Sequence, residues 1–187
     1  MAEVLPDRIT VDMTLNGSAV SVDVDPWESL ATTLRDRLRM TGTKVSCDVQ
    51  ACGACTVLVD RLPRSACTFL AYEADGREVL TVEGLASSDA ELHPLQSAFI
   101  DESAFQCGFC TSGMLMSAHA YLTTEDGADE EDLIEYMSGN LCRCTGYLPI
   151  VAAILRARRE GAGGIAGGGA GRSPSGPGAG APRRSAG

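Results

Sequence analysis

The chain has 187 residues, 5% of them aromatic, and a net charge of −10 at pH 7. Residues 1–160 hold 12 basic and 25 acidic side chains, a charge that disfavours binding to nucleic acid or to anionic membranes. The sequence starts without a basic and apolar leader, and no stretch approaches about 18 apolar residues, so we expect a soluble cytoplasmic protein. In that reducing compartment the eight cysteines should be free to bind metal.

A β-hairpin and a helix are predicted at the N-terminus. Apolar residues alternate over positions 8–24 around an Asn-Gly pair at 16–17, a pattern typical of two strands joined by a tight turn. The Asp-Pro pair at 25–26 is typical of a helix start, with Asp25 as the capping residue. Leucines then recur every four residues over 30–38, and Gly42 marks the predicted end of the helix.

Three further strands are predicted at residues 56–59, 67–70 and 79–82. Together with the hairpin they predict a mixed sheet packed by one helix, as in a β-grasp of the ferredoxin type. The predicted fold class is therefore α+β, with a first domain over residues 1–84.

Residues 85–160 show helical rather than strand periodicity and predict four short helices that form a small bundle. The apolar positions of the four helices are Leu95, Phe99 and Ile100; Met114, Leu115, Ala118, Tyr121 and Leu122; Leu133, Ile134 and Met137; and Ile150, Ala153, Ile154 and Ala157. The last helix is expected to begin at Pro149. Residues 161–187, rich in glycine, alanine and proline, are expected to form a disordered tail.

The first four cysteines follow the spacing of plant-type 2Fe-2S ferredoxins. Cys47, Cys52 and Cys55 form a C-x4-C-x2-C pattern, and Cys67 completes the tetrad. Gly53, between two of these cysteines, allows backbone amides to approach the sulfurs. Zinc sites usually pair C-x2-C elements, so this spacing favours iron-sulfur over zinc.

The second tetrad arrives as two close pairs, Cys107 with Cys110 and Cys142 with Cys144. Spacing alone leaves a structural zinc site open here. A disulfide between Cys142 and Cys144 is disfavoured, because alternate side chains of an extended segment point to opposite sides. The two histidines are not at ligand spacing: His93 is expected at a helix entry and His119 on a helix face.

The segments around the cysteines resemble the iron-sulfur subunit of the molybdenum hydroxylases, a family that includes xanthine dehydrogenase, aldehyde oxidase and aerobic carbon monoxide dehydrogenase. The resemblance is carried by residues 47–57, 106–114 and 138–147, and by the shorter segments 81–85 and 92–96. It runs in order from about residue 8 to 158. For the second tetrad it implies a 2Fe-2S cluster and removes most of the case for zinc.

The resemblance also implies a division of labour between subunits. A ferredoxin-like domain and a helical domain would each hold one 2Fe-2S cluster, with Cys107, Cys110, Cys142 and Cys144 next to the molybdopterin of a large partner subunit. The first cluster would lie nearer the FAD of a medium partner subunit, and electrons would pass from molybdenum through both clusters to FAD. Gln106 matches a position that touches the pterin; the alternative is an ordinary polar loop residue.

Two positions depart from the family pattern. Ser112 stands where the family usually has proline, which could change how the following helix begins and shift the potential of the cluster. The turn after Asp60 lacks the usual glycine, which leaves its type open.

No catalytic constellation is expected in this chain. The acidic run at 129–132 is interpreted as the solvated first turn of a helix. The predicted function is that of an electron-transfer subunit of a complex that oxidises a small aldehyde, heterocycle or similar compound with water as the oxygen source. The alternatives are a free-standing two-cluster ferredoxin and, less favoured, a protein that binds structural zinc.

Overall fold

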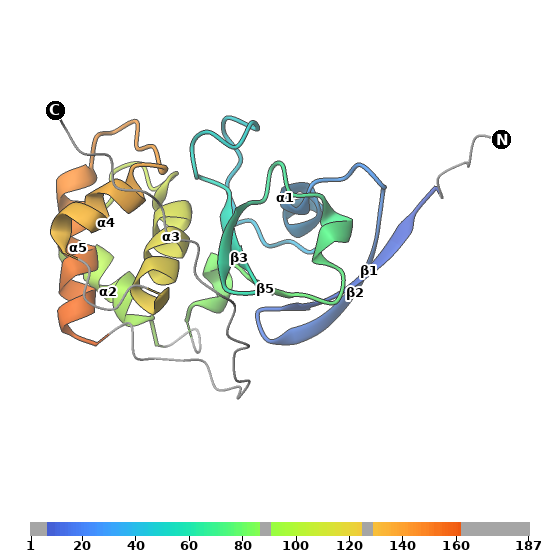
Figure 1. The fold of residues 1–187 in the computed structure, drawn as a ribbon, viewed down its shortest axis with the longest axis horizontal. Helices are drawn as coiled ribbons and strands as arrows, with labels where there is room; N and C mark the ends of the chain where they lie inside the picture. Colours follow the sequence, from blue (N-terminus) through green and yellow to red (C-terminus); the bar gives the residue numbers. More distant parts are fainter. Residues whose placement is uncertain (1–6, 87–90, 125–128, 162–187) are drawn as a thin grey trace, which may run out of the picture.

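The computed structural model describes residues 7–86, 91–124 and 129–161. A sheet-forming half and a helical half lie side by side, as Figure 1 shows. The predicted disordered tail, apart from Gly161, and residues 87–90 at the predicted domain boundary lie outside the described residues. Within the described ranges no helix is long and apolar enough to cross a bilayer.

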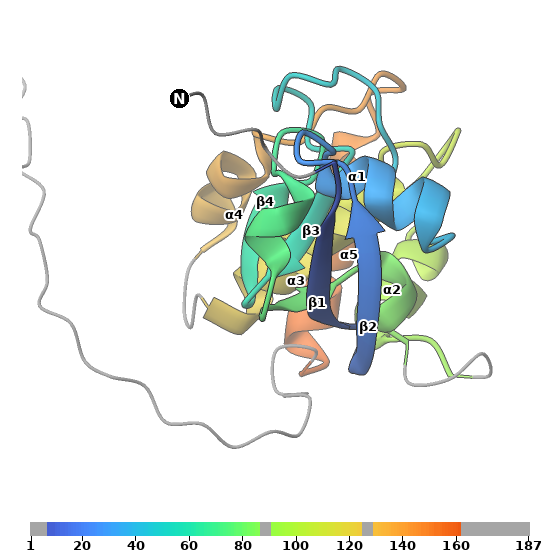
Figure 2. The same cartoon turned by 90° about the vertical axis from the view of Figure 1, so that its right-hand side faces the viewer.

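The sheet is mixed, as the sequence predicted. Its five strands run in the order β2-β1-β5-β3-β4, and β1 pairs in parallel with β5 while the other neighbours are antiparallel. The strands are β1 (Ile9–Leu15), β2 (Ser18–Val24), β3 (Thr56–Val59), β4 (Leu62–Ser65) and β5 (Glu78–Leu80). Figure 2, turned by 90°, shows β1 and β2 in front, with α3 and α5 of the helical half behind the sheet.

Both hairpins turn through left-handed backbone. Asn16 (φ 50°) and Gly17 (φ 80°) join β1 to β2, which confirms the predicted turn. Asp60 (φ 50°) and Arg61 (φ 68°) join β3 to β4 in the same way without a glycine. Two successive residues with positive φ are the mark of a type I′ turn, and aspartate adopts that conformation more easily than most residues. This geometry answers the question that the sequence left open about the second turn.

The predicted helix start at Asp25 is wrong. The backbone from Asp25 to Glu28 forms a turn, with the Glu28 amide donating to the Asp25 carbonyl at 2.9 Å, and helix α1 (Leu30–Thr32) begins only after Ser29. The Ser29 hydroxyl caps the helix by accepting from the Thr32 amide. Glu28 therefore precedes the helix instead of lying in its first turn. Its carboxylate is buried and forms an ion pair with Arg37. A π-helical segment, η1 (Thr33–Arg37), continues α1.

The strand predicted at residues 67–70 is also wrong. The Thr68 and Phe69 amides both donate to the Ser65 carbonyl, so the chain turns here, and only Leu70 makes an isolated bridge, with Ser29. The actual strand, β4, lies a few residues before the predicted one. It was missed because its side chains are mostly exposed, so they show no apolar alternation, and because it contains a proline. The strand predicted at 79–82 is shortened to β5, because the 3₁₀ segment η3 (Val82–Gly84) follows it; a second 3₁₀ segment, η2 (Ala71–Ala74), precedes β5.

Strand β3 is buried on both faces. Val57 and Val59 pack with the core between the sheet and α1, whereas Leu58 belongs to the apolar core of the helical half. A strand covered on both sides has no solvent face, so its residues read as a continuous apolar run rather than an alternation. β3 therefore joins the two halves.

The helical half consists of α2 (Pro94–Asp101), α3 (Thr111–Thr124), α4 (Glu130–Met137) and α5 (Tyr147–Arg159), which share one apolar core. Most of the predicted apolar positions lie in it, but Ile100 and Ile134 are exposed. Helix α5 begins two residues before the predicted Pro149. Proline is tolerated there because the first amides of a helix have no partner within the helix. The acidic run caps and opens α4, with the Asp129 carboxylate accepting from the Glu131 and Asp132 amides, as expected.

Candidate metal centres

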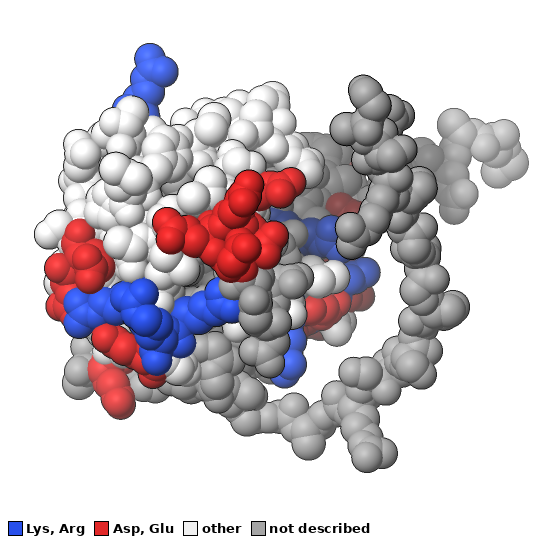
Figure 3. Space-filling model, turned by 60° about the vertical axis from the view of Figure 1, so that its left-hand side comes forward, with Lys and Arg blue, Asp and Glu red and all other residues white. Residues whose placement is uncertain are grey.

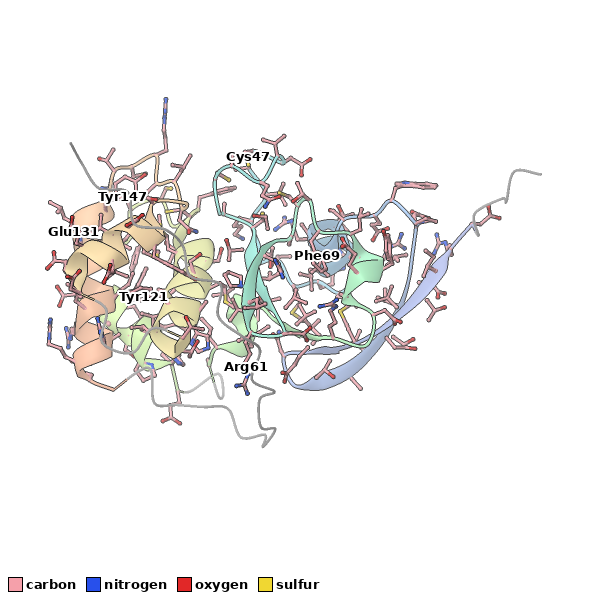
Figure 4. All side chains as sticks on the ribbon, in the orientation of Figure 1. Cys47, Arg61, Phe69, Tyr121, Glu131 and Tyr147 are labelled. Atoms are coloured by element: carbon pink, nitrogen blue, oxygen red, sulfur yellow. The ribbon has the colours of Figure 1, made fainter. Side chains whose placement is uncertain are left out.

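The first tetrad lies in a loop that precedes β3 and in the turn after β4. Cys55 and Cys67 are buried, while Cys47 and Cys52 are partly exposed. In Figure 4 the labelled Cys47 lies on this loop at the edge of the sheet-forming half. The loop contains residues with positive φ at Asp48, Gln50 and Gly53. Such left-handed residues turn successive amides toward one point, which suits a negatively charged group.

Backbone amides and burial divide these thiols into two kinds. The Val49 and Ala51 amides lower the pKa of Cys47 to about 7, and the Ala51 amide lies 3.3 Å from the Cys47 sulfur. Burial raises the pKa of Cys55 to about 12. The outer thiol is therefore ready to bind metal as a thiolate near neutral pH, whereas metal would have to displace the proton of the inner one.

The second tetrad shows the same division with different local structure. Cys110 directly precedes α3, and Cys142 is buried in the connection between α4 and α5. The Phe109 amide, helped by the Cys144 thiol, lowers the pKa of the exposed Cys107. Burial, followed by the hydrogen bond to Cys142, raises the pKa of Cys110 to about 12.

Residues 145–147 shape the loop around Cys142. The Gly146 amide donates to the Cys142 sulfur at 3.4 Å, and the Cys142 amide donates to the Tyr147 hydroxyl at 2.8 Å. Thr145 has positive φ (58°). The labelled Tyr147 lies at the same edge of the molecule as Cys47 in Figure 4. No role was predicted for Tyr147 beyond its place in a segment that resembles the family.

Within each tetrad, neighbouring thiols shift one another's pKa in pairs. In the first tetrad, Cys52 adds to the backbone amides that lower the pKa of Cys47, and Cys67 adds to the burial that raises the pKa of Cys55. In the second tetrad, Cys144 adds to the Phe109 amide that lowers the pKa of Cys107, and Cys142 adds to the burial that raises the pKa of Cys110. One zinc ion would instead draw four sulfurs to about 3.8 Å from one another. Among the described residues, no three metal-ligating side chains are grouped so as to hold a single metal ion.

Two pairs of thiols fit a 2Fe-2S cluster, because four thiolates hold its two irons, with two thiolates on each iron. Further support comes from the hydroxyls of Thr111 and Ser112, which directly follow Cys110. Both oxygens are buried without a hydrogen-bond partner in the described structure. Cluster sulfur is an acceptor of the kind these hydroxyls lack. Helix α3 begins at Thr111, so the serine in place of proline leaves the helix start next to Cys110.

The two cysteine loops contact each other directly. The Leu141 amide donates to the Cys52 carbonyl at 2.9 Å, and the Asn140 side-chain amide donates to the Gly53 carbonyl at 3.1 Å. Gly113, in the first turn of α3, also lies against Gly53. Sequence reasoning missed the contact between Asn140 and Gly53, because these residues are 87 positions apart. The only available signal was the position of Asn140, two residues before a predicted ligand.

Gln106 lies beside the second tetrad. Its side-chain amide donates to the Cys144 carbonyl at 3.1 Å, and the residue is exposed. This contact holds the Gln106 side chain at the edge of the cysteine loop. The position is consistent with contact to a pterin and with an ordinary polar loop residue.

The two histidines contact each other within the helical half. His93 caps α2 through Nδ1, which accepts from the Leu95 amide, and its ring packs edge-on against His119 of α3 with ring centres 5.2 Å apart. The predictions of a helix entry and a helix face are therefore confirmed. Burial, followed by the charge of His93, lowers the pKa of His119 to about 4.

Comparisons with known proteins agree with this geometry. Residues 13–81 match the family described as the 2Fe-2S iron-sulfur cluster binding domain, and residues 81–155 match the 2Fe-2S binding domain. The nicotine 6-hydroxylase small subunit of Paenarthrobacter nicotinovorans is 48% identical, over 81% of this chain and 90% of that protein. One subunit of the probable xanthine dehydrogenase of Bacillus subtilis (strain 168) is 44% identical, over 79% of this chain and 84% of that protein.

The solved structures give the same result. A chain of quinoline 2-oxidoreductase from Pseudomonas putida 86 superposes with a TM-score of 0.78 at 40% identity, covering 83% of this chain and 99% of that one. At these identities and coverages, the chain belongs to the family of iron-sulfur small subunits of the xanthine dehydrogenase and aldehyde oxidoreductase type of molybdenum hydroxylases.

Proposed function

We propose that this chain is the electron-transfer subunit of a molybdenum hydroxylase complex and that its eight cysteines hold two 2Fe-2S clusters. Cys47, Cys52, Cys55 and Cys67 would hold one cluster, and Cys107, Cys110, Cys142 and Cys144 the other. The observation that carries the proposal is the direct contact between the two cysteine loops. A protein that used its metals only for stability would have no need to bring the two sites together.

The loop contact supplies a short route between the clusters. From Cys52 the chain runs through its own carbonyl oxygen, across the 2.9 Å hydrogen bond to the Leu141 amide, and on to Cys142. Each cluster, when bound, can accept and pass on one electron. The residues of this chain hold the ligands, exclude water from the inner thiols, and donate amides to the sulfurs.

We infer the domain organisation from the same features. Residues 1–84 would form a ferredoxin-like domain, and residues 85–160 a four-helix bundle that holds the second cluster. Residues 161–187 would be a tail outside both domains. The cytoplasm is the proposed location, since eight free thiols need a reducing compartment.

A large molybdopterin-binding subunit is the proposed partner on the helical side. Apolar residues next to the second tetrad are exposed, namely Phe105, Phe109, Leu141, Tyr147 and Leu148. Exposed apolar groups gathered at one place are typical of a protein interface. Figure 3 shows that the upper part of this side is uncharged apart from a basic side chain that projects at the top, while acidic and basic side chains gather below. Gln106 would contact the pterin with the carboxamide oxygen that its bond to Cys144 leaves free.

A medium FAD-binding subunit is the proposed partner near the first tetrad. Electrons would enter through the second cluster, cross to the first, and leave to FAD. The overall reaction would oxidise a small aldehyde, heterocycle or similar compound, taking the oxygen from water and releasing two protons and two electrons. Two one-electron clusters can hold both electrons of one turnover.

Metal analysis and co-purification test this function. Anaerobically purified protein should contain iron and acid-labile sulfide in equal amounts, and dithionite should produce two reduced-state EPR signals. Colourless protein that contains zinc instead of iron would contradict the proposed function. A chain that elutes alone from a sizing column, after co-expression with both partner subunits, would instead favour a free-standing ferredoxin.

A further inference from the structure

Asn140 joins the loops of the two tetrads. It is only 6% exposed and stands two residues before Cys142. Its Nδ2 donates to the Gly53 carbonyl, which belongs to the residue directly after Cys52. One side chain therefore ties a residue next to a ligand of the first tetrad to the segment that carries a ligand of the second.

The fit between Asn140 and Gly53 is tight. Gly53 has positive φ (69°), and a Cβ on it would meet Asn140 Nδ2 at 2.5 Å and the Gly139 carbonyl at 3.0 Å. The loop of the first tetrad thus approaches the second as closely as a backbone without a side chain allows.

Gly113 makes a matching approach from the start of α3. A Cβ on Gly113 would collide with the Gly53 carbonyl oxygen and lie 3.0 Å from the Ala54 Cα. These neighbours are backbone atoms, so they cannot give way by rotating a side chain. Because α3 follows Cys110 directly, any displacement at Gly113 would move the first loop away from the ligands of the second tetrad.

We propose that Asn140 and Gly113 are positioning residues that fix the separation of the two clusters and thereby the rate of electron transfer between them. The proposal rests on the proposed function. Neither residue is expected to bind iron. Because electron transfer weakens steeply as the gap between two centres widens, a small displacement of the Gly53 loop should slow the transfer without changing either cluster's own ligands.

The test uses the full chain with both clusters reconstituted. In Asn140→Asp the shape is kept, but the donor is replaced by a carboxylate that repels the Gly53 carbonyl; Asn140→Ala removes the donor without adding charge. Gly113→Ala pushes on the same loop from α3. Gly139→Ala is the matched control, because a Cβ there meets no atom within 4 Å.

Two measurements report the separation: the magnetic splitting between the two reduced clusters in EPR, and the rate at which one electron equilibrates between them after flash photoreduction. We expect Asn140→Asp, Asn140→Ala and Gly113→Ala to retain both clusters, to lose splitting, and to equilibrate at least about 10-fold more slowly. The cluster potentials should stay unchanged in Asn140→Ala and Gly113→Ala, which add no charge. Gly139→Ala should match the wild type.

Unchanged splitting and rate in Asn140→Asp and Gly113→Ala, with both clusters present, would overturn the positioning role. Loss of one cluster's signal in both Asn140 variants would also overturn it, by making Asn140 a structural part of that cluster's site. A wild-type chain without reducible clusters would refute the proposed function instead, so the two failures are distinguishable.

Discussion

The first tetrad is built almost entirely from one loop, whereas the second joins two segments of the chain. Cys47, Cys52 and Cys55 lie within nine positions, and their loop is shaped by left-handed residues and amide hydrogen bonds. Cys110 and Cys142 are 32 positions apart and come from the start of α3 and the connection between α4 and α5.

Despite this difference, both tetrads pair one thiol of lowered pKa with one whose pKa burial raises to about 12. Each proposed cluster would therefore have a water-facing edge with amide donors and an apolar edge toward a protein core. The difference between the tetrads lies in what the cluster does for folding. A cluster that joins distant segments should stabilise its half more than one held by a preformed loop.

Removing a ligand should give the largest effect and test that difference. Cys142→Ser should abolish one of the two reduced-state EPR signals and lower the melting temperature of the helical half strongly, because the substitution releases α3 from the connection between α4 and α5. Cys52→Ser should abolish the other signal with a smaller thermal effect. EPR and thermal unfolding by circular dichroism measure both. Equal thermal effects would contradict the comparison, and two unchanged signals would contradict the ligand assignment.

Strand β3 allows the two halves to be perturbed separately. Leu58 packs into the helical core and Val57 into the sheet core, each nearly fully buried. Leu58→Ala should cost about 2–5 kcal/mol through the lost contacts and the cavity left behind, and it should loosen the junction between the halves. Val57→Ala removes less volume on the other face and should leave the junction intact. Unfolding followed by cluster absorbance should separate into two steps only in Leu58→Ala; a single step in both variants would argue against β3 as the joint.

The halves should also differ in their sensitivity to acid. Burial lowers the pKa of His119 in the helical half from 6.5 to about 4, so the unfolded chain binds the proton more readily. The stability that His119 contributes is complete above about pH 6.5 and is lost as the pH falls from there toward 4. Because His119 is partly exposed, we expect a loss of about 1 kcal/mol between pH 7 and pH 5.

Glu28, in the sheet-forming half, behaves differently. Its hydrogen bond to Arg37 lowers the pKa of the Glu28 carboxyl below 4.5. The stability that Glu28 contributes is therefore complete above about pH 4.5 and is lost only as the pH falls below that value. Urea unfolding at pH 7 and pH 5, with intact cluster absorbance as a check, measures the difference. His119→Gln should reduce the pH dependence over this range and leave the part that is due to His93, whose pKa burial also lowers. An undiminished pH dependence in this variant would show that His119 is not responsible.

The parts of the fold that local rules determine could be predicted from the sequence. The Asn16-Gly17 turn and the alternating residues around it predicted the first hairpin, because a two-residue turn with two left-handed positions sets the register. The helix start at Asp25 failed because the buried ion pair of Glu28 with Arg37 overrides a capping signal. Strand β4 was missed because its exposed residues carry no alternating pattern.

The cysteine tetrads were predicted by their spacing, but their mutual arrangement was not. Which thiols contact each other depends on how the loop and the helices fold around them. The contact of Asn140 with Gly53 depends on how the two halves pack, and no local pattern of a single sequence reports packing between positions so far apart.

Ser112 should have the smallest effect and refine the comparison of the two clusters. Its hydroxyl is buried without a partner two positions after Cys110, and a bond from it to cluster sulfur would favour the reduced state. Ser112→Ala should therefore lower the potential of the second cluster by a few tens of millivolts, the equivalent of one modest hydrogen bond, and leave the first unchanged. Ser112→Thr, which keeps the hydroxyl, is the control. Redox titration followed by EPR resolves the two clusters. An equal shift in both would mean that the substitution acts through the junction of the loops, and no shift would mean that the hydroxyl does not reach the cluster.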